Sequence, residues 1–147
     1  MAETDLNEKT TDYNEFNRKL IEEFRANGGQ VGGMFAGAPL LLLTTTGAKS
    51  GQPRVAPLAY TTDNGRLVVI ASKGGAPTHP DWFYNVRANP DVTVEVGTET
   101  FPARATIPEG AERQRLFDLM AAQMPNFTEY QRNTTRKLPV IVLERAG

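Results

Sequence analysis

The chain contains no cysteine and a single histidine, His79. Without cysteine there are no disulfides, no thiolate metal ligands and no cysteine nucleophile. One histidine excludes a metal site built from several histidines of one chain, so we expect no metal. Long apolar stretches are missing too, because the longest uninterrupted run, Ala38 to Leu43, is far too short to span a bilayer.

A large excess of charge of either sign is absent as well. The 147 residues include 16 Lys and Arg against 17 Asp and Glu, which argues against nucleic-acid binding. A chain of this length predicts one domain with a substantial core. The N-terminal residues 1–13 are acidic and polar, unlike a signal peptide, so we expect a cytoplasmic protein.

Acidic residues are scarce in the middle of the chain, where residues 24–80 contain Asp63 alone. A basic, glycine-rich stretch in a nearly neutral protein predicts a local anion site. The alternative is that each cation is an ordinary solvated surface residue. The cations of this stretch are Arg25, Lys49, Arg54, Arg66 and Lys73.

The apolar pattern predicts a disordered tail at residues 1–11, followed by one domain at residues 12–147. Apolar residues at helical spacing predict a helix from Asp12 to about Asn27, which packs on a core, covers a site or touches a membrane surface. Further helices are expected at residues 79–89 and 109–124. Strands are expected at residues 39–46, 54–62, 66–72, 91–96, 100–107 and 138–144.

Turn signals pair most of these strands as antiparallel hairpins. Asp63-Asn64-Gly65 predicts a hairpin between residues 54–62 and 66–72, and Gly97-Thr98 predicts another between 91–96 and 100–107. Pro57 indicates a bulge or a sheet edge. The fold class is therefore α+β, a small antiparallel barrel with helices over its openings.

Two loops combine glycine with basic residues. The stretch "GAKSGQPR" at residues 47–54 is not a P-loop, because Lys49 follows an alanine and the segment leads into a strand. Its glycines still permit a tight turn with outward N–H groups, and Lys49 and Arg54 add charge. Residues 72–76, "SKGGA", repeat this composition. Trp82 and Asn85 follow on one face of the short helix, as a flat-ring wall or as core residues, and His79 is read as a helix-start residue.

Three longer stretches carry a family resemblance: "LLLLTTTGAKSGQPRVAPLAY", "LVVIASKGGAPTHPDWFYNVRANPDVTVEV" and "YQRNTTRKLPVIVLER". Together they resemble the deazaflavin-dependent nitroreductase family of actinobacteria across residues 13–145. The resemblance implies an FMN-binding split-barrel-like fold. It also implies hydride transfer from reduced 8-hydroxy-5-deazaflavin, coenzyme F-420, to a quinone, an unsaturated lactone or a nitro compound. Ala59 stands where nitroimidazole-activating members often have tyrosine, which argues against that activity.

The resemblance also implies the roles of single residues. Lys49, Arg54 and Lys73 would bind the phosphate and the start of the coenzyme's acidic tail. The backbone of Ser72, Lys73, Gly74, Gly75 and Ala76 would wrap the phosphate or the ring. The deazaflavin pocket would comprise Pro57, Ala71, Trp82 and Asn85.

The hydride acceptor needs a proton or a hydrogen-bond donor as charge develops on it. Tyr130 is the leading candidate, with Ser72, Tyr60 and water as alternatives. Two other functions fit the same loops, a non-catalytic deazaflavin carrier and an FMN-binding split-barrel protein. A homodimer is expected by analogy with other split barrels, and peripheral membrane contact through the N-terminal helix is compatible with quinone reduction.

Overall fold

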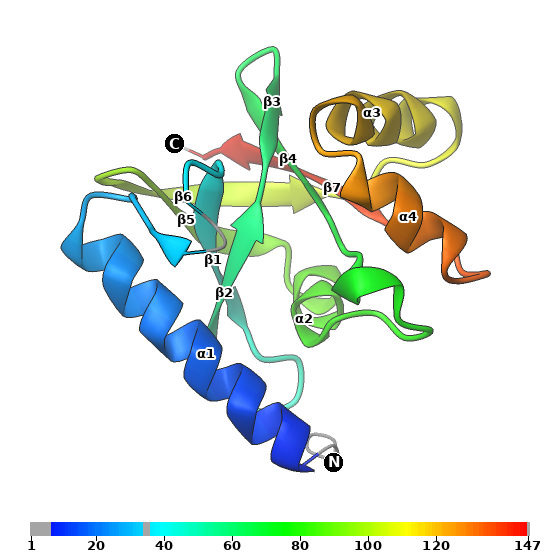
Figure 1. The fold of residues 1–147 in the computed structure, drawn as a ribbon. Coiled ribbons are helices and arrows are strands. Elements are labelled where there is room, and N and C mark those ends of the chain that lie inside the picture. Colours follow the sequence, from blue (N-terminus) through cyan, green and yellow to red (C-terminus); the bar gives the residue numbers. More distant parts are fainter. Residues whose placement is uncertain (1–6, 34–35, 147) are drawn as a thin grey trace.

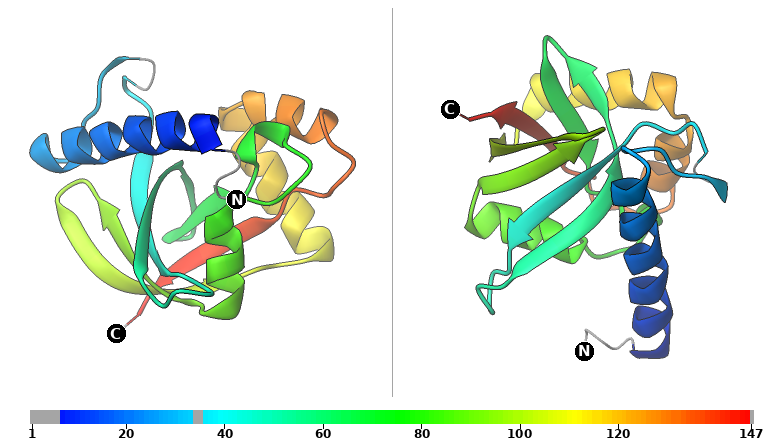
Figure 2. Two further views of the ribbon diagram at one scale, coloured as in Figure 1. Left: turned by 90° about the horizontal axis from the view of Figure 1, so that it is seen from below. Right: turned by 90° about the vertical axis from the view of Figure 1, so that its left-hand side faces the viewer.

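The computed structural model describes residues 7–33 and 36–146. A seven-stranded antiparallel sheet, in the order β2-β1-β5-β6-β7-β4-β3, curls into an open barrel with helices around it (Figures 1 and 2). The strands are β1 Leu40–Thr46, β2 Pro53–Ala59, β3 Thr61–Asp63, β4 Arg66–Ile70, β5 Asp91–Val96, β6 Glu99–Thr106 and β7 Val140–Arg145. The helices are α1 Asn7–Ala26, η2 Lys73–Gly75, α2 Asp81–Ala88, α3 Gly110–Gln123 and α4 Asn126–Arg132. The predicted α+β antiparallel barrel class is confirmed.

The prediction of a single strand at residues 54–62 was wrong, because the chain divides there at Tyr60 into two strands with different partners. Here the N–H of Tyr60 donates to the carbonyl of Pro39 at 3.1 Å. β2 before the break pairs with β1, whereas β3 after it pairs with β4 around Asn64-Gly65. Pro57 lies on edge strand β2, as its missing N–H requires. The predicted β5–β6 hairpin is present.

The continuous run of leucines in β1 is buried because both faces of this strand are covered. Leu41 and Leu43 belong to the apolar cluster shared by the strands and α2, whereas Leu40 and Leu42 pack against Phe24 of α1. All four leucines are buried. α1 therefore closes the outer face of β1, and the packed-helix interpretation of this segment holds.

The helix begins at Asn7, so it includes residues 7–11, which the sequence pattern assigned to the tail. Residues 1–6 of that expected tail lie outside the described residues. α3 and α4 cover the sheet beside β4 and β7 (Figure 1). α4 was not expected, because its seven residues give too short an apolar pattern to reveal a helix.

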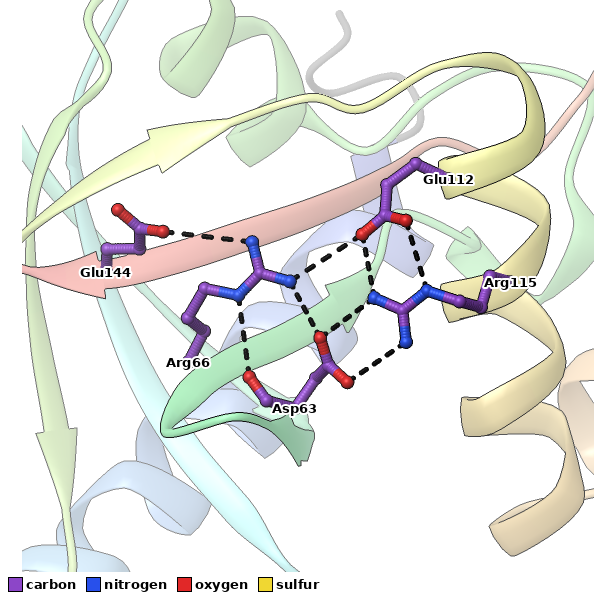
Figure 3. A network of polar contacts seen from close by, with 5 residues as sticks. All are labelled: Asp63, Arg66, Glu112, Arg115 and Glu144. Atoms are coloured by element: carbon purple, nitrogen blue, oxygen red, sulfur yellow. Dashed lines mark hydrogen bonds and ion pairs between the residues drawn. The ribbon is translucent and has the colours of Figure 1, made fainter.

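An ion network fastens the β3–β4 hairpin to α3 and β7 (Figure 3). Asp63 accepts from Arg66 at 2.7 Å and from Arg115 at 3.0 Å, and Arg115 also donates to Glu112 at 2.8 Å. Glu144 of β7 lies 3.8 Å from Arg66. Hydrogen bonds from Arg115 and Arg66 lower the pKa of Asp63 from 3.8 to about 2. The central carboxylate therefore stays charged well into the acid range.

We expect Asp63→Asn to lower the free energy of unfolding near neutral pH, because both arginines lose their charged acceptor. The pKa of Asp63 is lower in the folded chain than in the unfolded chain. The stabilisation is thus complete above 3.8 and disappears as the pH falls toward about 2. Urea unfolding across this pH range should show that the free energies of unfolding of Asp63→Asn and the parent converge as the solution becomes acidic.

Asp91→Asn is the matched control, since Asp91 forms a single exposed ion pair with Arg104 at 2.8 Å. An exposed pair contributes little, so this variant should remain close to the parent chain. A constant difference between Asp63→Asn and the parent at every pH would contradict the role assigned to the Asp63 charge.

Candidate functional site

The first predicted anion loop, residues 47–52, is the turn that joins β1 and β2. It is closed by hydrogen bonds from Gly47 N to Gln52 O at 2.8 Å and from Gly51 N to Gly47 O at 2.9 Å. Lys49 and Arg54 are exposed. Within the part of the chain that the structure describes, Arg54 makes only long contacts of 3.5 Å, to Ser50 Oγ and to the Pro53 carbonyl. Both cations thus remain accessible to an external anion.

The second loop has a backbone shape that gathers N–H groups. Ser72 is in the right-handed helical region, whereas Lys73 and Gly74 have φ values of 49° and 64°. A right-handed residue followed by a left-handed one points successive N–H groups into one concavity, which binds anions. Among the described residues, no hydrogen bond uses the N–H of Ser72, Lys73 or Gly74. We call these three donors the 72–74 nest.

Helix α2 connects the two loops through Asn85. The buried Asn85 side chain accepts from Ala48 N at 2.9 Å and donates to Thr45 Oγ1 at 3.1 Å. Both ends of its amide are therefore used to hold the first loop against α2. The second loop leads directly into the start of α2 at Asp81. Asn85 positions the first loop, and a direct contact with a coenzyme stays a prediction.

The residues expected to line the ring differ in accessibility. Trp82 is half-buried and packs against the main apolar cluster, and Pro57 is half-buried on β2. Ala71 is completely buried, its N–H donates to Pro139 O, and its carbonyl accepts from Arg136. Trp82 and Pro57 retain side-chain surface for a ligand, whereas the Ala71 side chain does not.

The backbone of α4 at Tyr130 packs against the loop that carries Ser72. Gly75 packs so closely on α4 that a Cβ there would lie 2.6 Å from the Tyr130 carbonyl. This contact places Tyr130 beside the loop that carries Ser72. The Tyr130 ring is half-buried and meets Phe127 edge-on, with centroids 5.6 Å apart. Tyr60, by contrast, lines an open cavity of about 320 Å³ beside the glycine-rich connector after α1.

Sequence reasoning missed Arg136 and the partner of His79. Arg136 Nη1 lies 2.9 Å from His79 Nδ1, and the same guanidinium donates to three carbonyls of the second loop. Burial, and then the charges of Arg136 and Arg87, lower the pKa of His79. Since these contacts join residues 57 to 65 positions apart, no local pattern could reveal them.

The described residues contain neither a cluster of metal-ligating side chains nor a membrane-spanning helix. In residues 7–33 and 36–146, no three His, Asp or Glu side chains gather as metal ligands would. No helix in the same ranges is both long and apolar enough to cross a bilayer.

Comparison with known proteins decides the family. The family model described as F-420H(2)-dependent quinone reductase matches residues 16–145. The chain belongs to this family. An F-420H(2)-dependent quinone reductase of Mycobacterium tuberculosis is 41% identical over 126 residues, which cover 83% of this chain and 85% of the relative. The reductase therefore transfers hydride from reduced coenzyme F-420 to a quinone, and the carrier alternative is not supported.

Solved structures agree with this assignment. The structure of an F-420-H2 dependent reductase has a TM-score of 0.67 and 45% identity, covering 72% of this chain and 94% of that one. A structure described as a domain-swapped dimer has a TM-score of 0.69 and 40% identity, covering 91% and 98%. A heme storage protein of Vibrio cholerae has a TM-score of 0.59 at 17% identity, covering 86% and 88%, and shares the fold alone.

Proposed function

We propose that the reductase binds the coenzyme phosphate at the 72–74 nest, with Lys73, Lys49 and Arg54 supplying positive charge. The observation that supports this proposal best is the set of three adjacent N–H donors without a partner among the described residues. Lys73 extends from the same loop, and among the described residues its ammonium donates only to the exposed Thr78 hydroxyl, at 3.1 Å. A loop with free donors and an accessible cation fits an anionic group of the coenzyme.

The remaining loop and pocket residues are assigned to the coenzyme by the same proposal. Gly74, Gly75 and Ala76 keep the loop compact around the phosphate, and Pro57 and Trp82 border the ring. Ala71 and Asn85 act indirectly, by supporting the two loops. When bound, the reduced coenzyme supplies the hydride, and the chain's own groups bind it, orient it and stabilise charge on the acceptor.

Tyr130 and Ser72 are proposed to donate hydrogen bonds to the oxygen of the acceptor, where negative charge develops. Their elements touch at Gly75, which supports a shared position beside the phosphate loop. Tyr60 is kept as the less favoured donor, and it lines the cavity beside the connector after α1. Quinones are the acceptors that the family establishes. Unsaturated lactones and nitro compounds remain proposals for this chain.

Anaerobic mixing of the enzyme with reduced coenzyme F-420 and a quinone panel tests the function. We expect Tyr130→Phe to lower kcat about 100-fold, because a preorganised donor is lost at the charge-bearing oxygen. Ser72→Ala should have a smaller effect than Tyr130→Phe. Tyr84→Phe is the control, since this exposed tyrosine of α2 contacts the rings of His79 and Phe83 and has no proposed role toward the acceptor.

Coenzyme oxidation at the background rate with every quinone would contradict the proposed activity. An unchanged kcat in Tyr130→Phe would instead exclude Tyr130 as the donor, leaving Ser72, Tyr60 and water as proton sources, and the activity would stand.

We further propose that the reductase forms a homodimer, as the relative described as a domain-swapped dimer does. Membrane contact through α1 and a cytoplasmic location stay predictions. Any membrane contact would have to use the outer face of α1, because its inner residues Leu20 and Phe24 are buried against β1. On the outer face, Arg18 pairs with two glutamates.

A further inference from the structure

Arg136 lies in the segment between α4 and β7 and reaches across to the second loop. Its Nε donates to Ala76 O at 2.7 Å, its Nη2 to Ser72 O at 2.7 Å, and its Nη1 to Ala71 O at 3.3 Å. The rigid guanidinium fork thus binds three carbonyls of one short loop. These three hydrogen bonds hold the loop on the side that faces Arg136, which is opposite to the Ser72 and Lys73 N–H groups.

Two of the three carbonyls that Arg136 binds, those of Ala71 and Ser72, belong to peptide units of the 72–74 nest, whereas the Ala76 carbonyl precedes Pro77, which has no N–H. In a trans peptide the C=O and N–H groups point in opposite directions, and no described peptide is cis. The Ala71 carbonyl shares its peptide with Ser72 N–H, and the Ser72 carbonyl shares its peptide with Lys73 N–H. Since both carbonyls point to Arg136, both N–H groups point away from it.

The third donor of the nest is oriented from within the loop. The Lys73 carbonyl accepts from Ala76 N at 3.1 Å, and it shares its peptide with Gly74 N–H. Gly75 N also donates to Ser72 O at 2.9 Å. Every carbonyl of the three peptide units therefore accepts a hydrogen bond within the protein, whereas no hydrogen bond among the described residues uses their N–H groups.

Arg136 also leaves positive charge behind the loop. A guanidinium only donates, so His79 Nδ1 must accept from it, which requires a neutral ring with its proton on Nε2. Among the described residues, Arg136 forms no ion pair with a carboxylate, and its partners are three carbonyls and this neutral ring. Polarised carbonyls make the N–H groups of the same peptides stronger donors.

We propose that Arg136 is a positioning residue for coenzyme binding, which holds the 72–74 nest so that its N–H groups face the coenzyme phosphate. The inference rests on the phosphate site of the proposed function and adds the group that shapes it. Arg136 itself lies behind the loop and does not touch the phosphate.

Calorimetric titration with oxidised coenzyme F-420 tests the role. We expect Arg136→Met to raise the Kd about 10- to 100-fold, the loss typical of hydrogen bonds with a charged partner. Arg136→Lys keeps the charge but not the fork, so it should recover only part of the affinity. In turnover, the KM for the coenzyme should rise while kcat at saturating coenzyme stays unchanged.

Arg132→Met is the matched control, because Arg132 is an exposed α4 arginine paired only with Glu129. It should bind the coenzyme as the parent does. Thermal unfolding of all variants establishes that each is folded before binding is compared.

The free protein provides a readout that needs no coenzyme. In ¹⁵N NMR spectra, Arg136→Met should shift the amides of Ser72, Lys73 and Gly74. It should also raise the pKa of His79, because the neighbouring cation is gone. Unshifted nest amides would overturn the proposal.

The binding data separate the two proposals. If Lys73→Ala weakens binding and Arg136→Met does not, the positioning role fails and the phosphate site stands. If Arg136→Lys binds as tightly as the parent, charge alone suffices and the positioning role also fails. If neither Lys73→Ala nor Arg136→Met affects binding, the phosphate site is wrong and the role of Arg136 falls with it.

Discussion

Deazaflavin binding is expected to weaken about 10- to 100-fold in Lys73→Ala and in Arg54→Ala, the range for hydrogen bonds to charged groups. Both cations are exposed and make no ion pair among the described residues, so their charge is available to a phosphate or to the acidic tail. Arg54 can form a bidentate contact, whereas Lys73 provides a single ammonium beside the nest. Calorimetric titration of each variant with coenzyme F-420 measures the loss.

Ionic strength provides a second measurement of the same site. Exposed charges are screened by salt, so the affinity of the parent chain should fall with added salt more steeply than that of either variant. Arg104→Ala is the control, because Arg104 is an exposed cation on β6 that pairs with Asp91. Equal affinity of both variants and the parent would contradict the anion site.

The same titrations separate the deazaflavin from the flavin alternative. We expect the parent chain to bind coenzyme F-420 with much higher affinity than flavin mononucleotide. Tighter binding of flavin mononucleotide than of coenzyme F-420 would contradict the coenzyme assignment.

Gly75→Ala is expected to lower the free energy of unfolding by about 2–5 kcal/mol, from left-handed backbone strain together with overpacking. Gly75 has a φ of 85°, and a Cβ there would lie 2.6 Å from the Tyr130 carbonyl. A backbone atom cannot rotate away as a side chain can, so α4 must move from the loop. This displacement would also separate Tyr130 from Ser72.

Gly74→Ala is the matched control for this variant. Gly74 has a similar φ of 64°, but a Cβ there meets nothing within 4 Å. It should therefore show only the strain cost, about 1–2 kcal/mol. Urea unfolding of both variants compares them directly, and equal losses would show that the loop–α4 contact adds nothing.

Local sequence patterns predicted most elements of the fold, because their causes lie within a few residues. The leucines of β1, the Asn64-Gly65 turn and the Gly97 turn each produced the expected strand or hairpin. The break at Tyr60 was not predicted, because it depends on the Pro39 carbonyl and on two competing strand pairings. The apolar run across residues 54–62 contains no signal of that competition.

For the candidate site, the sequence indicated the exposed basic residues of the two loops but not the groups that hold these loops. Lys49, Arg54 and Lys73 are exposed cations on glycine loops, as their composition indicated. The interpretation of Asn85 changed, because its amide is used on Thr45 and Ala48. Arg136 was not singled out, because a basic residue in a polar segment usually indicates solvated surface.

The sequence by itself determined most of the strands and helices, the two basic glycine loops and, by resemblance, the coenzyme. Only the tertiary structure decided which way those loops present their N–H groups. The orientation depends on hydrogen bonds that Arg136 donates and that Asn85 accepts, which join residues 37 to 65 positions apart. Such bonds form only when the sheet curls and brings α2, α4 and the loops together, so they leave no periodic trace in the chain.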